Sequence, residues 1–346
     1  MDTKTSHLGE KLRKLAPLPF SVFMEQALFD RDAGYYSQHI STIGRRGDFS
    51  TSATLSPTLS RAIARWLQKL WRSNPSLPRT VIEIGAGDGS LAQGILKHIG
   101  LLARQRLRYH IVETSAPLAK QQVSRLGKYR RCRWYPDMQQ ALAETGGEAI
   151  IISNELIDAF PAELLQWDQD KQCWCQLLLD HDGVHWVTRT GKPVPLPASS
   201  SLATGHNLVN GQIVERHDSY IDWLGKWIRQ WQIGEMLTID YGDLFPQLYD
   251  RRPRGTLRAY FAQNRLESMG EILARPGCQD ITADIDFSDL RARTAALGLK
   301  EIAYQRQLEF ISSQKVNATG DDPATNPHGA GSAFKVLWQR RTGLSG

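Results

Sequence analysis

The chain has 346 residues, of which 41% are hydrophobic and 23% charged, and its 42 basic and 36 acidic side chains give a net charge of +6. This composition is typical of a globular protein of one or two domains and excludes disordered and fibrous classes. No apolar run reaches the roughly 18 residues of a transmembrane helix, so no membrane span is expected. The positive charge favours acidic partners, but no nucleic-acid-binding motif accompanies it, so a nucleic-acid partner is not expected.

The first residues and the cysteines indicate a cytoplasmic protein. Asp2 and Glu10 lie in an N-terminal stretch without an apolar core, so no secretory signal is expected. Cys173 and Cys175 would share one face of a strand. No further ligands stand at metal-binding spacing, and we predict no metal site. We therefore expect buried, reduced thiols, and the sequence gives no expectation of oligomeric state.

The predicted elements indicate an α/β fold. Residues 1–79 are predicted to be mainly helical, and Pro57–Trp71 is the clearest helix. From residue 80 onward, strands and helices alternate. The predicted strands are Thr80–Ile84, Arg108–Glu113, Cys132–Tyr135, Ala149–Ser153 and Met236–Asp240, and the predicted helices between them are Ser90–Ile99 and Pro117–Arg125. Strands separated by helices predict βαβ units and a parallel sheet.

Residues 162–212 interrupt this alternation. The segments Glu163–Trp167, Cys173–Leu179 and Val184–Val187 alternate in polarity and are separated by turns, which predicts an inserted antiparallel β-meander. The Pro- and Ser-rich segment Gly191–Gly211 is the candidate linker. We therefore expect an N-terminal helical cap region (1–79) and a core (80–346) that contains the insertion.

Three further elements are predicted in the C-terminal half. Trp223, Trp227 and Trp231 recur every four residues, which predicts a buried stripe on a helix over 219–231. Ser288 is predicted to cap a helix that ends at Gly298. Ala333–Trp338 is predicted to be the last strand.

The loop Glu83-Ile84-Gly85-Ala86-Gly87-Asp88-Gly89 predicts a nucleotide site, because it follows a strand and opens a helix. Glu113 ends the next strand, where a carboxylate can accept both ribose hydroxyls. Ser90 breaks the dinucleotide fingerprint, and the acid at Glu83 would repel a pyrophosphate. S-adenosylmethionine (SAM) carries a sulfonium and an ammonium instead. We therefore predict SAM as the cofactor, with S-adenosylhomocysteine as its product. Its candidate ligands are Glu83, Gly85, Gly87, Gly89, Glu113 and Asn154.

The candidate catalytic residues follow the predicted strand Ala149–Ile152. Asn154, Glu155 and Asp158 would face the donor methyl, because ligands of open α/β sheets bind beyond the carboxyl ends of the strands. Asp240 and Tyr241 end a later strand and should lie nearby. Two carboxylates can orient a guanidinium and receive its proton. The alternative is that Asn154 caps a helix and Asp158 pairs with a surface base.

The segment Gly44–Thr51 predicts a substrate or cofactor loop, because two glycines flank Arg45 and Arg46 ahead of Asp48. Either arginine could bind the carboxylate of the methionine moiety or pair with Glu155. The alternative is a solvated surface turn.

Together these motifs resemble the MidA-type class I SAM-dependent methyltransferases, bacterial proteins related to the mitochondrial complex I assembly methyltransferase. The resemblance spans nearly the whole chain. It rests on Pro19–Ser21, Phe23–Glu25, Gly34–Tyr36, Gly44–Phe49, Glu83–Gly89, Val112–Glu113, Asn154–Pro161, Ile239–Gly242, Gly255–Leu257 and Asp280–Phe287. It implies a seven-stranded Rossmann-like sheet with an N-terminal helical cap, and methylation of arginine in a protein substrate.

The chain departs from the family pattern at three places. Ala53 and Thr54 replace a Pro-Glu pair, Asp284 stands where the family has histidine, and Gln263 lies where Gly-His is common. A lost histidine could mean a lost base or another acceptor. Three functions therefore compete with protein arginine methylation. They are methylation of a small molecule, a SAM-binding assembly chaperone with little catalysis, and a NAD-dependent oxidoreductase, which Ser90 disfavours.

Overall fold

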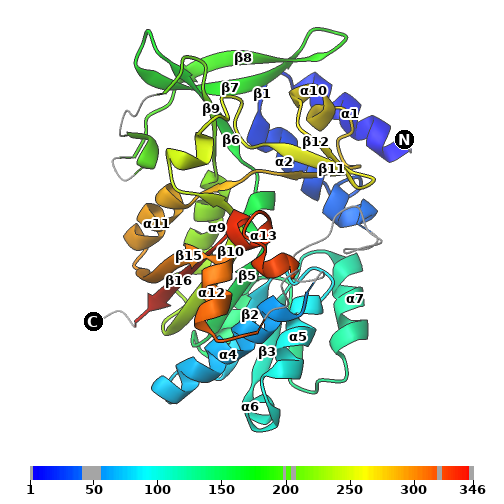
Figure 1. The fold of residues 1–346 in the computed structure, drawn as a ribbon. Helices are drawn as coiled ribbons and strands as arrows, with labels where there is room; N and C mark the ends of the chain where they lie inside the picture. Colours follow the sequence, from blue (N-terminus) through cyan, green and yellow to red (C-terminus); the bar gives the residue numbers. More distant parts are fainter. Residues whose placement is uncertain (1–2, 41–55, 198–199, 204–207, 318–321, 343–346) are drawn as a thin grey trace. The chain divides into compact units, whose positions relative to one another are not determined.

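The computed structural model describes residues 3–40, 56–197, 200–203, 208–317 and 322–342. The chain divides into two compact units, each built from three stretches of sequence (Figure 1). We call residues 42–156, 224–241 and 297–346 the sheet unit, and residues 1–41, 157–223 and 242–296 the meander unit. This division differs from the boundary expected at residue 80, because α4 (Thr58–Ser73) packs on the sheet unit.

The sheet unit contains seven strands of an eight-stranded sheet, in the order β15-β16-β10-β5-β2-β3-β4. Its strands are β2 (Thr80–Ile84), β3 (Arg108–Val112), β4 (Cys132–Tyr135), β5 (Ile150–Asn154), β10 (Gly234–Asp243), β15 (Lys300–Arg306) and β16 (Phe334–Arg341). The strands from β10 to β4 pair in parallel, and β16 runs antiparallel to β10 and β15. The expected Rossmann-like sheet is confirmed. Each of the five predicted central strands has both ends within two residues of the observed ones, except that β10 continues three residues further, to Asp243.

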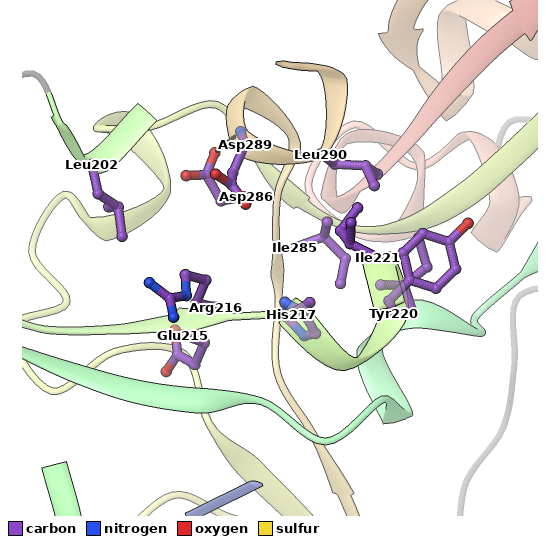
Figure 2. A pocket seen from close by; sticks show the side chains of 11 residues that line it. Leu202, Glu215, Arg216, His217, Tyr220, Ile221, Ile285, Asp286, Asp289 and Leu290 are labelled. Atoms are coloured by element: carbon purple, nitrogen blue, oxygen red, sulfur yellow. Dashed lines mark hydrogen bonds between the residues drawn. The ribbon is translucent and has the colours of Figure 1, made fainter. Parts of the chain in front are cut away.

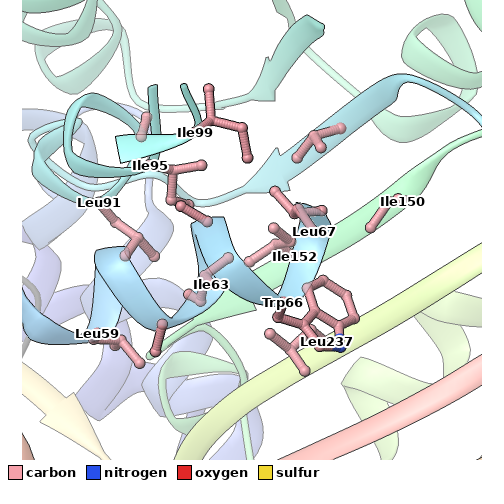
Figure 3. Packing of buried hydrophobic residues seen from close by; sticks show 14 of the residues in the cluster. Leu59, Ile63, Trp66, Leu67, Leu91, Ile95, Ile99, Ile150, Ile152 and Leu237 are labelled. Carbon is pink, nitrogen blue, oxygen red and sulfur yellow. The ribbon is translucent and has the colours of Figure 1, made fainter. Parts of the chain in front are cut away.

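Helices on this sheet bury a continuous apolar core. They are α4, α5 (Ser90–His98), α7 (Ala116–Leu126), α8 (Met138–Thr145), α12 (Gln307–Ser313) and α13 (Ala330–Ala333), with the 3₁₀ turn η5 (Pro323–Thr325). The short helix α6 (Leu101–Arg106) of the same unit has no buried residue. Leu59, Ile63 and Leu67 recur every four residues on α4, so they form one helical face. Figure 3 shows this face packed with Ile95 of α5 and Ile152 of β5. No helix among the described residues is both long and apolar enough to cross a membrane.

The meander unit contains two antiparallel sheets. The larger has the order β1-β7-β6-β9, with β8 on β7, and consists of β1 (Leu18–Pro19), β6 (Glu163–Asp168), β7 (Cys173–His181), β8 (Trp186–Pro193) and β9 (Ile213–Arg216). The smaller has the order β12-β11-β13 and consists of β11 (Arg258–Phe261), β12 (Asn264–Leu266) and β13 (Asp280–Thr282). The predicted meander is confirmed, and the N-terminal β1 adds a strand to it that the sequence did not predict.

Short helices complete the meander unit. They are α1 (Thr3–Leu15), α2 (Phe20–Phe29), α10 (Met269–Leu273), α11 (Phe287–Ala296), the one-turn π-helix η1 (Tyr35–His39), and the 3₁₀ turns η2 (Ile157–Ala159), η3 (Ser201–Ala203) and η4 (Gln247–Tyr249). The helix α9 (Asp218–Trp227) begins in this unit and ends in the sheet unit. The short strand β14 (Ile285–Asp286) pairs in parallel with residues 242–243 at the end of β10.

Three local predictions are wrong. The helix expected over 219–231 ends at Trp227, and Trp231 is buried beyond it with its indole N–H donated to the Ala149 carbonyl (2.9 Å). The predicted linker begins inside β8, which pairs with β7 as far as Pro193. Ser288 is not the cap of α11, because the Asp286 carboxylate accepts the N–H of Ser288 (2.8 Å). A carboxylate one residue ahead of a helix caps it by the same chemistry that was expected of serine.

Candidate functional site

The glycine loop of the sheet unit has a backbone that only glycine adopts without strain. Gly85, Gly87 and Gly89 have φ angles of +64°, +54° and +80°. A side chain on Gly85 would also place its Cβ 2.9 Å from a methyl of Leu156. The Gly85 N–H is donated to the Val112 carbonyl of β3 (3.0 Å), which ties the loop to the neighbouring strand. The loop therefore presents bare backbone at the carboxyl edge of the sheet.

Gln122 of α7 joins this loop to Glu113. Its amide Nε2 donates to the Gly87 carbonyl (2.8 Å) and to Oε2 of Glu113 (2.9 Å), and its Oε1 accepts the indole N–H of Trp134 (3.2 Å). The other carboxylate oxygen of Glu113 accepts the Ser115 N–H (2.8 Å). Burial raises the pKa of Glu113, and these hydrogen bonds lower it in part. Each carboxylate oxygen keeps a lone pair for a further donor, such as a ribose hydroxyl.

Asp88 occupies the N-terminus of α5. Its carboxylate accepts the N–H and the hydroxyl of Ser90 (both 2.9 Å) and forms an ion pair with Arg125 (2.7 Å). A phosphate bound at a helix N-terminus needs the free N–H groups and positive potential that this carboxylate already uses. The site therefore disfavours a pyrophosphate for a second reason besides Ser90.

Glu83 is placed beside the loop but carries less charge than the sequence suggested. Its side chain is 2% exposed, and the Tyr109 hydroxyl donates to its Oε2 (2.7 Å). Burial, together with the nearby carboxylates of Asp88 and Glu113, raises the pKa of Glu83 to about 7, although the Tyr109 hydrogen bond lowers it in part. At neutral pH the group is therefore only partly ionised, and the acid character of the loop depends more on Asp88 and Glu113.

At the end of β5 the chain forms a tight turn that aligns two candidate catalytic groups. The Asn154 amide donates to Oε1 of Glu155 (3.0 Å), and Glu155 has a left-handed φ of +53°. The turn is held by β10, because the Glu155 N–H is donated to Ile239 (2.9 Å) and the Leu156 N–H to the Asp240 carboxylate (3.1 Å). Within the described residues, the buried Oδ1 of Asn154 has no hydrogen-bond partner. A non-glycine residue held at positive φ is typical of functional sites.

Asp240 and Tyr241, which the sequence predicts near the substrate, make contacts within the sheet unit. Asp240 is fully buried, and its second carboxylate oxygen accepts the N–H of Tyr241 (2.9 Å). The Tyr241 ring lies 3.9 Å from the ring of Phe334. Asp240 therefore holds the Asn154–Glu155 turn in position through its buried carboxylate.

Asp158 belongs to the meander unit, where it is 5% exposed and its carbonyl accepts the Ala283 N–H (3.0 Å). Its charge acts on two buried groups there. It helps to raise the pKa of Tyr36, where burial and Asp280 are the larger causes. It also helps to raise the pKa of Arg258, where Asp284 and Tyr260 are the larger causes of the increase. Asp158 is therefore a buried carboxylate of the meander unit, and its role in catalysis stays a prediction. Arg45, Arg46, Asp48, Ala53 and Thr54 lie outside the described residues.

The departures at Asp284 and Gln263 both lie in the meander unit, and Asp284 has a structural role there. The Asp284 carboxylate forms ion pairs with the buried Arg258 and with Arg252 (2.8 Å), and the Asp284 N–H is donated to the Thr256 hydroxyl (2.9 Å). Burial alone would lower the pKa of Arg258, but the Asp284 carboxylate holds it above its ordinary value. Gln263 is exposed in the hairpin turn between β11 and β12.

Thr256 connects this ion pair to a second buried carboxyl. Glu215 accepts the Thr256 N–H (2.7 Å) and hydroxyl (3.0 Å), and burial raises the pKa of Glu215 to about 7. Gly255 has a φ of +82°, and a Cβ on it would lie 2.2 Å from Oε1 of Glu215. The Gly255–Leu257 motif therefore forms a turn around the buried carboxylate of Glu215, and this contact explains the glycine.

A polar pocket lies next to Glu215 in the same unit. Figure 2 shows Arg216 and His217 on one side and Asp286 and Asp289 on the other. Burial lowers the pKa of His217 to about 4 and raises that of Asp286 to about 6. The space inside is about 20 Å³. This is room for about one water molecule and too small for an acceptor side chain.

A family model described as "Putative S-adenosyl-L-methionine-dependent methyltransferase" matches residues 62–305, which include the glycine loop, Glu113 and the Asn154–Glu155 turn. The chain belongs to this methyltransferase family. Its cofactor is SAM. The described residues fit this cofactor. The bare glycine backbone, the Glu113 carboxylate and the Asn154 Oδ1, which has no partner among them, offer acceptors and space, and this part of the chain offers no phosphate site.

The relatives of this methyltransferase carry a common name. It is 27% identical to the Drosophila melanogaster protein arginine methyltransferase NDUFAF7 homolog over 95% of this chain and 83% of the relative. It is 27% identical to Xenopus tropicalis protein arginine methyltransferase NDUFAF7 over 83% of this chain and 69% of that one. A Burkholderia thailandensis crystal structure with bound S-adenosyl-homocysteine has the same fold, with a TM-score of 0.82, 24% identity, and coverage of 98% of this chain and 92% of that one.

Sequence reasoning missed several residues that shape these sites. Gln122, Arg125 and Asp88 hold the glycine loop, and Glu215 holds the Gly255–Leu257 turn. Gln122 is fully buried although glutamine is mostly exposed. No motif precedes it, and its role becomes visible only when α7 lies beside the loop.

Proposed function

We propose that this methyltransferase transfers the methyl group of SAM to a side-chain nitrogen of arginine in a protein substrate. The names of the relatives support an arginine acceptor, and the Asn154–Glu155 turn supports it chemically. The observation that carries the proposal is the left-handed Glu155, whose carboxylate is fixed by Asn154 at the carboxyl end of β5.

The chemistry of arginine explains the need for such a carboxylate. SAM supplies a methyl group on a sulfonium, which is electrophilic at neutral pH. A guanidinium is protonated at all ordinary pH values, and its nitrogens are delocalised and weakly nucleophilic. Glu155 would accept guanidinium hydrogen bonds, orient one nitrogen, and receive the proton that this nitrogen loses as its bond to carbon forms. Asn154 would keep the Glu155 carboxylate in position.

The proposal is tested by incubating the protein with radiolabelled SAM and a lysate of cells that lack it. We expect label in protein and methylarginine after hydrolysis, identified by mass spectrometry. Label in a small-molecule fraction, or on another side chain, would refute an arginine acceptor.

Variants of the turn separate catalysis from cofactor binding. Glu155→Gln keeps the oxygen that faces Asn154 and should retain affinity for S-adenosylhomocysteine while losing transfer. The matched control Glu144→Gln changes an exposed glutamate of α8 and should retain both. Full complementation of a deletion strain by an inactive Glu155→Gln protein would favour the chaperone function instead.

A further inference from the structure

The parallel strands of the sheet unit begin at the edge opposite the glycine loop, and arginines gather at the starts of three adjacent strands. The Arg108 N–H is donated to the Arg79 carbonyl and the Tyr109 N–H to the Arg131 carbonyl (both 3.0 Å). The chain segments that enter β2, β3 and β4 therefore lie side by side. We call this group the basic edge, and it consists of Arg79, Arg106, Arg108, Arg130, Arg131 and Arg133.

The positive charge of the basic edge is not neutralised within the described part of the chain. None of its six arginines forms an ion pair with a described carboxylate. Burial, and then the proximity of Arg106, lower the pKa of Arg79. Two exposed acidic residues lie nearby. Glu148 stands just ahead of β5, and the charge of Glu144 acts on Tyr135 together with those of Arg108 and Arg133, but neither glutamate forms an ion pair with a described arginine. The edge therefore carries a local positive field.

Two exposed leucines lead into the basic edge. Leu101 is 69% exposed and Leu102 is 81% exposed, and they open the short helix α6, which continues through Arg106 into β3. Figure 1 shows α6 at the lower tip of the sheet unit, next to β3. Adjacent leucines this exposed, beside a group of cations, are an apolar feature that the fold does not use.

We propose that the basic edge and the two leucines form a surface that binds membranes containing anionic lipids. Arginines would pair with the anionic headgroups, and Leu101 and Leu102 would reach the acyl boundary. Single-stranded nucleic acids are bound by basic grooves with exposed aromatic rings on which bases stack. Here the exposed apolar side chains are aliphatic, which favours lipid. β2 is five residues long, so roughly 15 Å of strand separates this edge from the glycine loop and leaves the cofactor site open.

Vesicle flotation tests the proposal, with phosphatidylcholine vesicles that either contain or lack phosphatidylserine. We expect the full chain to float only with the phosphatidylserine vesicles, and to be released in high salt because exposed charges are then screened. Each cation near such a surface contributes about fivefold to binding. Arg106→Glu/Arg131→Glu should therefore weaken binding by at least about 25-fold.

Matched controls change the same charge or the same exposed apolar area elsewhere. Lys192→Glu/Arg254→Glu alters two exposed cations of the meander unit and should leave binding unchanged. Leu101→Ser/Leu102→Ser should weaken binding, whereas Val184→Ser, at a residue that is 74% exposed, should not. Calorimetric titration with S-adenosylhomocysteine checks that every variant is folded.

Three results would overturn the proposal. These are equal flotation with both kinds of vesicle, equal loss of binding in the basic-edge variant and its control, or no flotation together with RNA binding that the basic-edge variant loses. The last result would assign the basic edge to nucleic acid. None of these results bears on methyl transfer.

Discussion

Replacing Glu113 with glutamine tests the cofactor site at the carboxylate on which it most depends. In the wild type, Oε1 of Glu113 accepts the Ser115 N–H and Oε2 accepts the Gln122 amide, so each oxygen has one lone pair left for a ribose hydroxyl. Glu113→Gln preserves the size of the side chain. In either orientation of the amide, its new NH₂ group replaces an oxygen that accepts a hydrogen bond from the protein and one from the ribose. One hydrogen bond within the protein and one to the ribose are therefore lost.

The expected magnitude follows from these bonds. Hydrogen bonds to charged groups contribute about 1.5–3 kcal/mol each, and neutral ones about 1 kcal/mol. Burial already disfavours the ionised carboxylate, which offsets part of the gain. We therefore expect S-adenosylhomocysteine to bind more weakly by about 2–3 kcal/mol, or roughly 30- to 150-fold.

Isothermal titration calorimetry with S-adenosylhomocysteine measures this loss without turnover. Glu148→Gln, at an exposed glutamate of the same unit, is the control for net charge. Because the pKa of Glu113 is raised, wild-type affinity should decline with acidification sooner than for an exposed glutamate, and Glu113→Gln should remove this dependence. An affinity within twofold of wild type would refute the assignment of Glu113 to the ribose.

Three further predictions concern the stability of the two units. In urea titrations, Gly85→Ala should lower the free energy of unfolding by more than Gly146→Ala does. Both positions have positive φ, which costs an alanine about 1–2 kcal/mol, but an added Cβ would meet a side chain within 4 Å only at Gly85. Of the two variants, only Gly85→Ala should weaken S-adenosylhomocysteine binding. The raised pKa of Glu83 means that its folded form holds a proton between about pH 4.5 and 7, so stability should fall as pH rises through this window, by up to about 3 kcal/mol. Glu83→Gln should remove this part of the pH dependence of stability. An unfolding pH profile identical to that of the wild type would contradict the prediction. Asp284→Ala should destabilise the protein by about 3–5 kcal/mol because it removes the carboxylate that forms an ion pair with the buried Arg258, and a change below about 1 kcal/mol in thermal unfolding would show that the pair is dispensable.

Local patterns in the sequence predicted the sheet unit well. The apolar run Thr80–Ile84 and the glycines that follow it determine their own conformation, because a buried parallel strand and a loop with positive φ each admit few residue types. The same holds for the polar cluster after β5, where the sequence placed Asn154 and Glu155 at the carboxyl edge.

The sequence did not predict features that depend on contacts between distant segments. The capping of α11 by Asp286 rather than Ser288 depends on contacts with distant residues, because the Ser288 hydroxyl accepts the N–H of Phe245 instead (3.0 Å). The burial of Asp240 behind the turn depends on the pairing of β10 with β5. Local spacing carries no information on such partners.

The position of β16 bears on how the protein folds during synthesis. This strand pairs with both β10 and β15 and is translated after both, so β10 leaves the ribosome with one hydrogen-bonding edge bare. An N-terminal portion of the nascent polypeptide cannot complete either unit, because each draws on stretches far apart in the gene. We therefore expect folding to be slow and largely post-translational, and we expect chaperones to protect the unpaired edge of β10 from aggregation.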